Sequence, residues 1–187
     1  ENLYTLVEVE DEIYKIPRFG KFQGDNFLLV YAAMKELGID KKTIKNGLLK
    51  VKWPGRFEIF NRNPLVILDG AHNEDSSLKL VENLKSISNK EDVCFLTSIL
   101  EDKDIGKILK NFSSVADKIV YTSLKDYHRG LGAKEMYDRD IYFDNRKYYE
   151  NMVEAYNEAK KSKIVVVAGS FYLLCEFRRV IESENRL

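Results

Sequence analysis

The spacing of hydrophobic residues changes near residue 53, and the two parts of the chain predict different structures. Over Leu3–Val9 and Ile13–Phe19 apolar and polar residues alternate, which is typical of two short strands joined as a hairpin. Over Asn26–Leu37 the apolar residues recur at helical spacing, and Gly38 follows as a stop signal. A shorter helix fits Lys42–Val51. The pattern therefore predicts a small unit over residues 1–52 that consists of a hairpin and two helices.

Beyond a break at Trp53-Pro54-Gly55, compact apolar runs rich in β-branched residues predict strands, and segments with helical spacing predict helices. The predicted strands are Leu65–Leu68, Val93–Thr97, Lys118–Tyr121 and Ile164–Ala168. The predicted helices are Asp75–Leu84, Ile105–Phe112, Tyr148–Lys160 and Phe171–Ile181. Continuous apolar strands that alternate with helices are typical of a parallel sheet covered on both faces. We therefore predict an α/β fold, with a doubly wound, mostly parallel sheet over residues 53–187.

Composition narrows the class of protein without identifying it. The 187 residues carry 30 Lys and Arg against 30 Asp and Glu, whereas a protein that binds nucleic acid over its surface normally has a basic excess. No apolar stretch is long enough to span a membrane, and no signal peptide is recognisable. We expect a cytoplasmic monomer with no nucleic-acid or membrane partner. Because the chain lacks an initiator Met and opens at Glu1 within a pattern, we expect a piece of a longer protein.

Several common chemistries find little support in the sequence. Cys94 and Cys175 lie inside apolar runs, so we expect buried thiols and no disulfide framework. His72 and His128 lie far apart in the sequence, so no metal site is predicted. No Gly-x-x-x-x-Gly-Lys-Ser/Thr segment occurs, and the chain therefore holds no P-loop of its own. The basic loop over residues 125–129 is expected to be solvated.

The most informative segment is Leu68-Asp69-Gly70-Ala71-His72-Asn73, which ends an apolar strand. Gly70 lets the backbone turn, and Asn73 suits an N-cap. Since ligands bind at the carboxyl edge of a parallel sheet, Asp69 and His72 would stand where a ribose hydroxyl, a phosphate or a carboxylate could be bound. An ordinary Asp-Gly turn with a solvated histidine is equally compatible with the spacing alone.

Two further segments offer weaker candidates. Arg56 follows the break at Trp53-Pro54-Gly55, where a guanidinium could reach phosphate across a closing cleft, and a surface ion pair is the alternative. Ser170 follows the predicted strand Ile164–Ala168 and could bind a small anion together with a helix N-terminus. Otherwise it is an N-cap serine. If each residue is considered by itself, the surface ion pair for Arg56 and the N-cap for Ser170 are favoured.

Together these segments resemble one family. Trp53-Pro54-Gly55-Arg56-Phe57-Glu58, followed by Leu68-Asp69-Gly70-Ala71-His72-Asn73, is similar to the folylpolyglutamate synthase/dihydrofolate synthase family of the Mur ligase superfamily. Further segments resemble the family in the expected order: Gly20-Lys21-Phe22-Gln23 with Asn26, Leu100-Glu101-Asp102-Lys103-Asp104, and Ala168-Gly169-Ser170-Phe171-Tyr172-Leu173. The resemblance covers essentially the whole chain.

The resemblance implies an ATP-dependent ligase that adds L-glutamate to folate or dihydropteroate with the help of Mg²⁺. The γ-phosphate of ATP would pass to a carboxylate of the pterin substrate, and the amine of glutamate would attack the resulting acyl phosphate. Residues 53–187 would be the Rossmann-like C-terminal domain of such an enzyme, and residues 1–52 the tail of its central ATP-binding domain. Which of the two pterin substrates is used stays open, because those contacts would lie upstream.

The resemblance also assigns roles to six residues. Three would bind the nucleotide: Asn26 the adenine, Arg56 the phosphates and Asp69 the ribose. The three expected on the catalytic, glutamate-binding side are His72, Ser170 and Tyr172.

The chain departs from the family pattern in two ways. Phe22 stands where the family has His, and Phe27 stands where a small residue usually follows Asn26, which should change packing against the nucleotide. The P-loop, the magnesium ligands and the folate pocket of the family would lie in an N-terminal region absent from this chain, so we predict that the chain alone does not turn over. The rival hypothesis is a stand-alone nucleotide-binding or interaction module that kept the ligase fold. A Mur-type peptidoglycan ligase is a third possibility, which the segment 69–73 fits less well.

Overall fold

The computed structural model describes residues 4–124 and 130–184. The chain divides into two compact units between Pro54 and Gly55.

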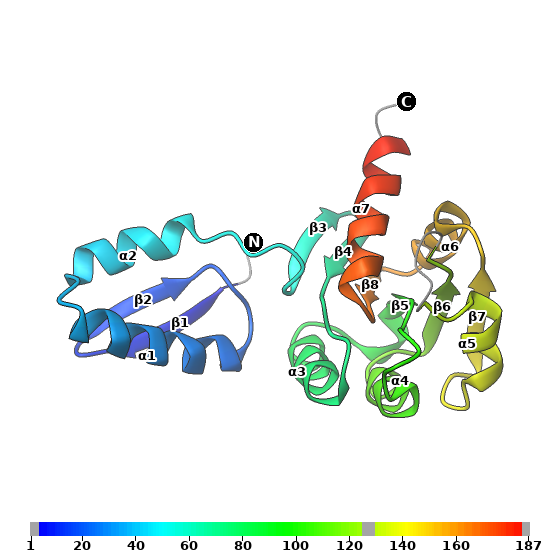
Figure 1. Ribbon diagram of the computed structural model, residues 1–187, viewed down its shortest axis with the longest axis horizontal. Coiled ribbons are helices and arrows are strands. Elements are labelled where there is room, and N and C mark those ends of the chain that lie inside the picture. The colour runs from blue at the N-terminus through cyan, green and yellow to red at the C-terminus, as the bar shows by residue number, and fades with distance from the viewer. Residues whose placement is uncertain (1–3, 125–129, 185–187) are drawn as a thin grey trace. The chain divides into compact units, whose positions relative to one another are not determined.

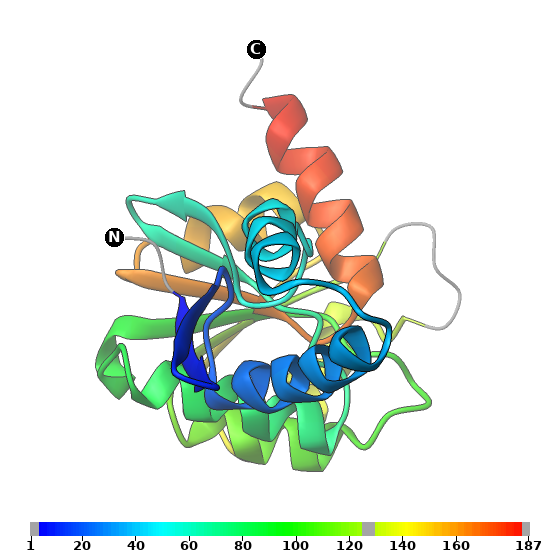
Figure 2. The same cartoon turned by 90° about the vertical axis from the view of Figure 1, so that its left-hand side faces the viewer.

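The first unit is a hairpin covered by two helices. Strands β1 (Thr5–Val9) and β2 (Glu12–Ile16) pair antiparallel. Helices α1 (Lys21–Glu36) and α2 (Lys41–Lys50) lie along them (Figures 1 and 2). The core of the unit consists of Tyr14, Ile16, Phe27, Tyr31 and Ile44.

The predicted elements of the first unit are confirmed, and the largest shift of a boundary is at the start of the first helix. Helix α1 begins at Lys21, five residues before the predicted start, because Gly24 and Phe27 in its first turns already face the hairpin and are buried. Gly38 has a φ of 72°, the left-handed conformation that ends a helix. The buried ring of Phe27 lies 5.0 Å from that of Tyr14, so this departure from the family pattern fills the core of the unit.

The second unit contains a six-stranded sheet within the described residues, with the order β3-β4-β8-β5-β6-β7. Its strands are β3 (Glu58–Arg62), β4 (Leu65–Leu68), β5 (Val93–Thr97), β6 (Lys118–Thr122), β7 (Asn145–Tyr149) and β8 (Ile164–Ala168). Its helices are α3 (Glu74–Lys85), α4 (Ile105–Ser113), α5 (Ala133–Arg139), α6 (Met152–Ala159) and α7 (Phe171–Glu184). Only β3 runs antiparallel to its neighbour, so the prediction of a mostly parallel α/β sheet is confirmed (Figure 1).

Helices cover both faces of this sheet, as the fully apolar central strands require. On one face, residues such as Val120 and Val165 pack against α6 and α7 in the larger core cluster. On the other, the rings of Phe95 in β5 and Phe112 in α4 stack with their centroids 3.9 Å apart.

Besides a single 3-10 turn over Lys90–Asp92, two described strands and one described α-helix of the second unit were not predicted: β3, β7 and α5. Strands β3 and β7 form the two edges of the sheet, where one side lacks a partner and charged residues are favoured. Their sequences, Glu-Ile-Phe-Asn-Arg and Asn-Arg-Lys-Tyr-Tyr, therefore lack a continuous apolar run. The predicted helix over Tyr148–Lys160 is wrong at its start, because its first two residues belong to the edge strand β7.

The prediction of two buried thiols is half right. Cys94 in β5 is buried and Cys175 in α7 is exposed, and both are free. The apolar neighbours of Cys175 in the sequence lie on the inner side of the helix, whereas the cysteine itself faces solvent.

Candidate functional site

The sequence candidates of the second unit gather where β4 and β8 end. These strands are parallel neighbours, with Leu68 opposite Val167. Just beyond them, the Gly169 N–H donates a hydrogen bond of 2.9 Å to the Ala71 carbonyl. A side chain at Gly169 would collide with Thr97 and Ser98, so glycine is required at this crossing. The turn after β4 and the start of α7 therefore lie side by side.

Asp69 ties two backbone segments together at this edge. Its carboxylate accepts a hydrogen bond of 2.8 Å from the Phe57 N–H through Oδ2 and one of 2.9 Å from the Ala71 N–H through Oδ1. Burial raises the pKa of Asp69 to about 6, and the two backbone donors oppose that rise only in part. Asp69 thus works as a clamp that holds the segment before β3 against the end of β4.

The clamp fixes Arg56 between two residues with left-handed backbone. Gly55 has a φ of 72° and Phe57 a φ of 46°, which is unusual for a residue with a bulky side chain. The Gly55 carbonyl accepts a hydrogen bond of 2.7 Å from the Gly70 N–H, so the strained segment is held from both sides of Arg56. Strain of this kind persists only where the surroundings enforce it, and it is frequent at functional sites.

Glu58 completes this support. Its Oε2 accepts a hydrogen bond of 2.7 Å from the Gly55 N–H and also pairs with the Arg178 guanidinium from α7. Arg178 in turn lies over the Phe60 ring, 5.6 Å from its centroid. Nothing in the sequence marks Glu58 as a site residue, because its partner is 120 positions away.

Phe171 is the second residue that sequence reasoning missed. The Arg56 guanidinium lies over its ring, 5.0 Å from the centroid, and the His72 ring lies 6.1 Å away. A Cβ at Gly70 would overlap this ring, and Gly70 does not have a positive φ. The prediction that Gly70 serves a sharp turn is therefore corrected: its role is to leave room for Phe171. The segment Gly169-Ser170-Phe171-Tyr172 carries part of the family resemblance, but only Ser170 and Tyr172 in it were assigned a role.

His72 and Asn73 begin helix α3 as the spacing predicts. The Asn73 side chain accepts a hydrogen bond of 2.9 Å from the Ser76 N–H, which confirms the N-cap. The Nδ1 atom of His72 lies 2.8 Å from the Gly70 carbonyl. Since a carbonyl only accepts, Nδ1 carries the proton, and Nε2 is left for a ligand.

Ser170 and Tyr172 differ in access. Ser170 is buried, and its Oγ accepts a hydrogen bond of 3.1 Å from the Leu173 N–H, so it caps α7 as the structural alternative foresaw. Tyr172 is 48% exposed on the first turn of the same helix. Contact of either residue with glutamate stays a prediction.

Two other groups of candidates do not belong to the described part of the second unit. Asn26 is exposed on α1 in the first unit. The basic loop over residues 125–129 lies outside the described residues, and with it His128. Among residues 4–124 and 130–184, no three His, Cys, Asp or Glu side chains come together as a set of metal ligands. No helix in that part of the chain is long and apolar enough to cross a membrane.

The arrangement suits an anionic ligand. The N-termini of α3 and α7 both begin at this edge, and a helix N-terminus carries a partial positive charge. The exposed guanidinium of Arg56 lies over the Phe171 ring at this edge, and the imidazole of His72 lies near the same ring.

Comparison with known proteins agrees with this geometry. Residues 55–171 match the family described as Mur ligase, glutamate ligase domain. The chain belongs to the Mur ligase family. It is 33% identical over 145 residues to the dihydrofolate synthase/folylpolyglutamate synthase of Bacillus subtilis, an alignment that covers 75% of this chain and 33% of the relative. The namesake from Escherichia coli is 28% identical over 166 residues, which cover 86% and 38% of the two chains.

Two solved structures share the fold of this chain. The Thermotoga maritima folylpolyglutamate synthase superposes with a TM-score of 0.78 at 26% identity, over 94% of this chain and 43% of that one. Escherichia coli FolC in complex with DHPP and ADP gives a TM-score of 0.69 at 28% identity, over 78% and 35%. The chain thus corresponds to a C-terminal part of a folylpolyglutamate synthase/dihydrofolate synthase, and it spans a third to under half of the length of these relatives.

Proposed function

We propose that this chain forms the glutamate-ligase part of an ATP-dependent enzyme that joins L-glutamate to folate or dihydropteroate. The observation that carries the proposal is Arg56, fixed between two left-handed residues and stacked on Phe171 beside two helix N-termini. Such a preorganised cation suits phosphoryl transfer, which depends on positioning and charge neutralisation. The relatives named as synthases of this type, and the FolC complex with DHPP and ADP, support the same function.

In this proposal the chain acts on an acyl phosphate. ATP first gives its γ-phosphate to a carboxylate of the pterin substrate. The glutamate amine then forms a bond to the carbonyl carbon, the bond from that carbon to the phosphate oxygen breaks, and inorganic phosphate leaves while the amine loses a proton. Arg56 neutralises the phosphates and Asn26 contacts the adenine. Asp69 reaches the ribose while it holds the segment around Arg56.

The glutamate side of the proposed reaction uses the first turns of α3 and α7. His72 has Nε2 left for a contact, and Tyr172 is exposed, so both are placed to hold the incoming amino acid. Ser170 contributes through the N-terminus that it caps. When bound with ATP, Mg²⁺ would supply further neutralisation of the phosphates, and we assign none of its ligands to this chain.

The surface of the first unit is consistent with a part of a larger domain. Its hairpin and α1 expose large apolar side chains, with Leu6 at 57%, Ile13 at 61% and Leu29 at 75%. A unit of this size is only marginally stable by itself, because it buries a small fraction of its surface. We propose that residues 1–52 are the tail of a central ATP-binding domain, and that the isolated chain does not turn over.

The test uses the complete product of the reading frame that encodes this chain. Formation of the glutamyl amide is followed with ATP, Mg²⁺, labelled glutamate, and folate or dihydropteroate in turn. Arg56→Ala should lower kcat/KM by about 100-fold or more, since it removes a preorganised charge. Arg139→Ala is the matched control, because among residues 4–124 and 130–184 the Arg139 side chain pairs only with Glu135, on the surface of α5.

Two outcomes would contradict the proposal. One is full activity of Arg56→Ala in the complete protein. The other is amide formation by the 187-residue chain alone. Nucleotide binding without amide formation in the complete protein would favour the stand-alone binding module.

A further inference from the structure

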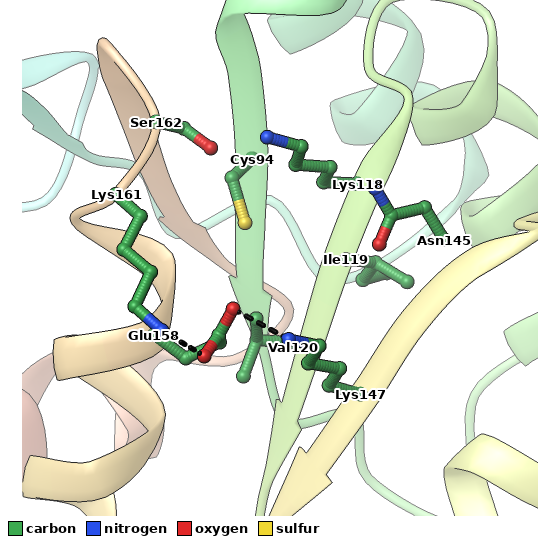
Figure 3. Close-up of a pocket in the computed structure, with 9 residues that line it drawn as sticks. All are labelled: Cys94, Lys118, Ile119, Val120, Asn145, Lys147, Glu158, Lys161 and Ser162. Carbon is green, nitrogen blue, oxygen red and sulfur yellow. Dashed lines mark hydrogen bonds and ion pairs between the residues drawn. The ribbon is translucent and has the colours of Figure 1, made fainter.

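A polar pocket lies at the amino edge of the sheet, opposite the edge that carries Arg56. Its floor and walls come from the first residues of β5, β6 and β7 and from the end of α6 (Figure 3). The lining residues are Cys94, Lys118, Ile119, Val120, Asn145, Lys147, Glu158, Lys161 and Ser162. None of them belongs to the site around Arg56, so the pocket is a separate feature of the unit.

The pocket gathers like charges on one face of the sheet. Lys118 stands opposite Asn145, and Val120 opposite Lys147, in the parallel ladder of β6 and β7. Residues two apart in a strand point to the same face, so Lys118 and Lys147 are diagonal neighbours there. Lys161 joins them from the turn after α6. Like charges on neighbouring strands repel each other, and a bound anion would offset that repulsion.

One carboxylate does not balance these charges. Glu158 pairs with Lys147 at 2.8 Å through Oε1 and with Lys161 at 2.7 Å through Oε2. Figure 3 shows both lysines converging on it from opposite walls. The Lys118 ammonium group has no hydrogen bond or ion pair with a described residue, and its charge acts on the neighbouring Cys94 thiol. The lining therefore carries two more positive charges than negative ones.

The C-terminus of α6 opposes an anion, but weakly. Its last carbonyls contribute roughly half a negative charge. Three of them already accept backbone hydrogen bonds from Lys160, Lys161 and Ser162. The two excess ammonium charges outweigh this contribution.

The remaining surface also suits a compact polar ligand. Besides the ammonium groups, Ser162 offers a hydroxyl and Asn145 a carboxamide. Ile119 and Val120 form an apolar part of the lining. The cavity of about 210 Å³ equals the liquid volume of about seven waters, which is enough for a hydrated tetrahedral ion.

We propose that this pocket binds a small dianionic oxyanion of the phosphate type, bridged between Lys118 and the pair formed by Lys147 and Lys161. The free ion and the phosphate of a small phosphorylated metabolite share this chemistry. The site is independent of the proposed ligase reaction.

The experiment titrates the ¹⁵N-labelled 187-residue chain with sodium phosphate, sodium sulfate and a small phosphomonoester at constant ionic strength, with sodium chloride as reference. We expect saturable amide shifts over residues 94, 118–120, 145–147 and 158–162, with a dissociation constant on the order of 1 mM. A phosphomonoester that binds more tightly than the free ions would identify a metabolite as the ligand. Shifts around residues 56, 70–72 and 171–173 report the other edge and are counted separately.

The matched variants are Lys118→Gln and Lys110→Gln. Lys118→Gln removes the unpaired charge without touching Glu158, and we expect affinity to fall about fivefold, as for the loss of one ion pair of about 1 kcal/mol. Lys110 lies exposed on α4, away from the pocket, and its variant should bind as the parent does. The proposal is overturned if chloride produces the same shifts, if the pocket amides do not saturate, or if a folded Lys118→Gln variant binds unchanged.

Discussion

The two edges of one sheet hold their cations in different ways. At the carboxyl edge a single guanidinium is fixed by strained backbone, by the Asp69 clamp and by the Phe171 ring. At the amino edge two lysines on flexible stems pair with one carboxylate, and a third lysine lines the same pocket. Arginine is planar and can be stacked and preorganised, whereas lysine is a mobile point charge. The comparison indicates that the first edge is built at a cost in stability for one geometry, and that the second adapts at little cost.

The largest test of this difference is the pH dependence of stability, because Asp69 is buried. Its pKa is raised from 3.8 to about 6 on folding, so the folded state binds the proton more tightly than the unfolded state. Stability from this group is present below pH 4 and lost as pH rises to about 6, a total of roughly 3 kcal/mol. The free energy of unfolding in urea should therefore fall between pH 4 and 7 in the parent, and this fall should be absent in Asp69→Asn.

The control for that measurement is Asp75→Asn, since Asp75 is exposed on the first turn of α3. It should keep the slope of the parent. If Asp69→Asn also keeps it, the buried carboxylate does not carry the cost assigned to this edge.

The next test concerns the space left for the Phe171 ring. Gly70→Ala should destabilise the chain by about 1–3 kcal/mol, as overpacking of a filled site does. Adding Phe171→Ala should recover part of that loss, since the two substitutions act on one contact. Gly132→Ala is the control, because nothing lies within 4 Å of a Cβ there and the φ is −62°. Strictly additive effects in thermal unfolding would show that the ring does not set the requirement for glycine.

The smallest effect is expected at the amino edge. The two lysines lower the pKa of Glu158 to about 2, so their contribution is present above pH 4.5 and fades as pH falls toward 2. Both lysines are largely exposed, so solvent screening holds this contribution below about 1 kcal/mol. Glu158→Gln should therefore lower stability at pH 7 by less than that amount, and Glu154→Gln on the same helix should not. If Glu158→Gln lowered the free energy of unfolding by several kcal/mol, the amino edge would be as tightly built as the carboxyl edge, and the comparison would fail.

The sequence predicts the parts of this molecule that depend on local patterns. The four central strands are continuous apolar runs, and Asn73 and Ser170 are recognisable caps. The edge strands β3 and β7 escape prediction, because an edge does not require an apolar sequence.

The candidate site divides in the same manner. Asp69 and His72 follow a strand and can be placed at the sheet edge from spacing alone. Glu58 and Phe171 depend on contacts between distant segments, to Arg178 and to Arg56 respectively. Such contacts leave no periodic signal in a single sequence, and neither does the positive φ of Phe57.

The position of β8 also bears on how the chain is made. Among the described strands of this sheet it is the last in chain order, yet it lies between β4 and β5, which pair with it and not with each other. The growing polypeptide therefore carries two separate halves of a sheet, each with an open edge, until the segment of β8 leaves the ribosome. A messenger truncated before Ile164 would leave those edges exposed, and its product would be prone to aggregation.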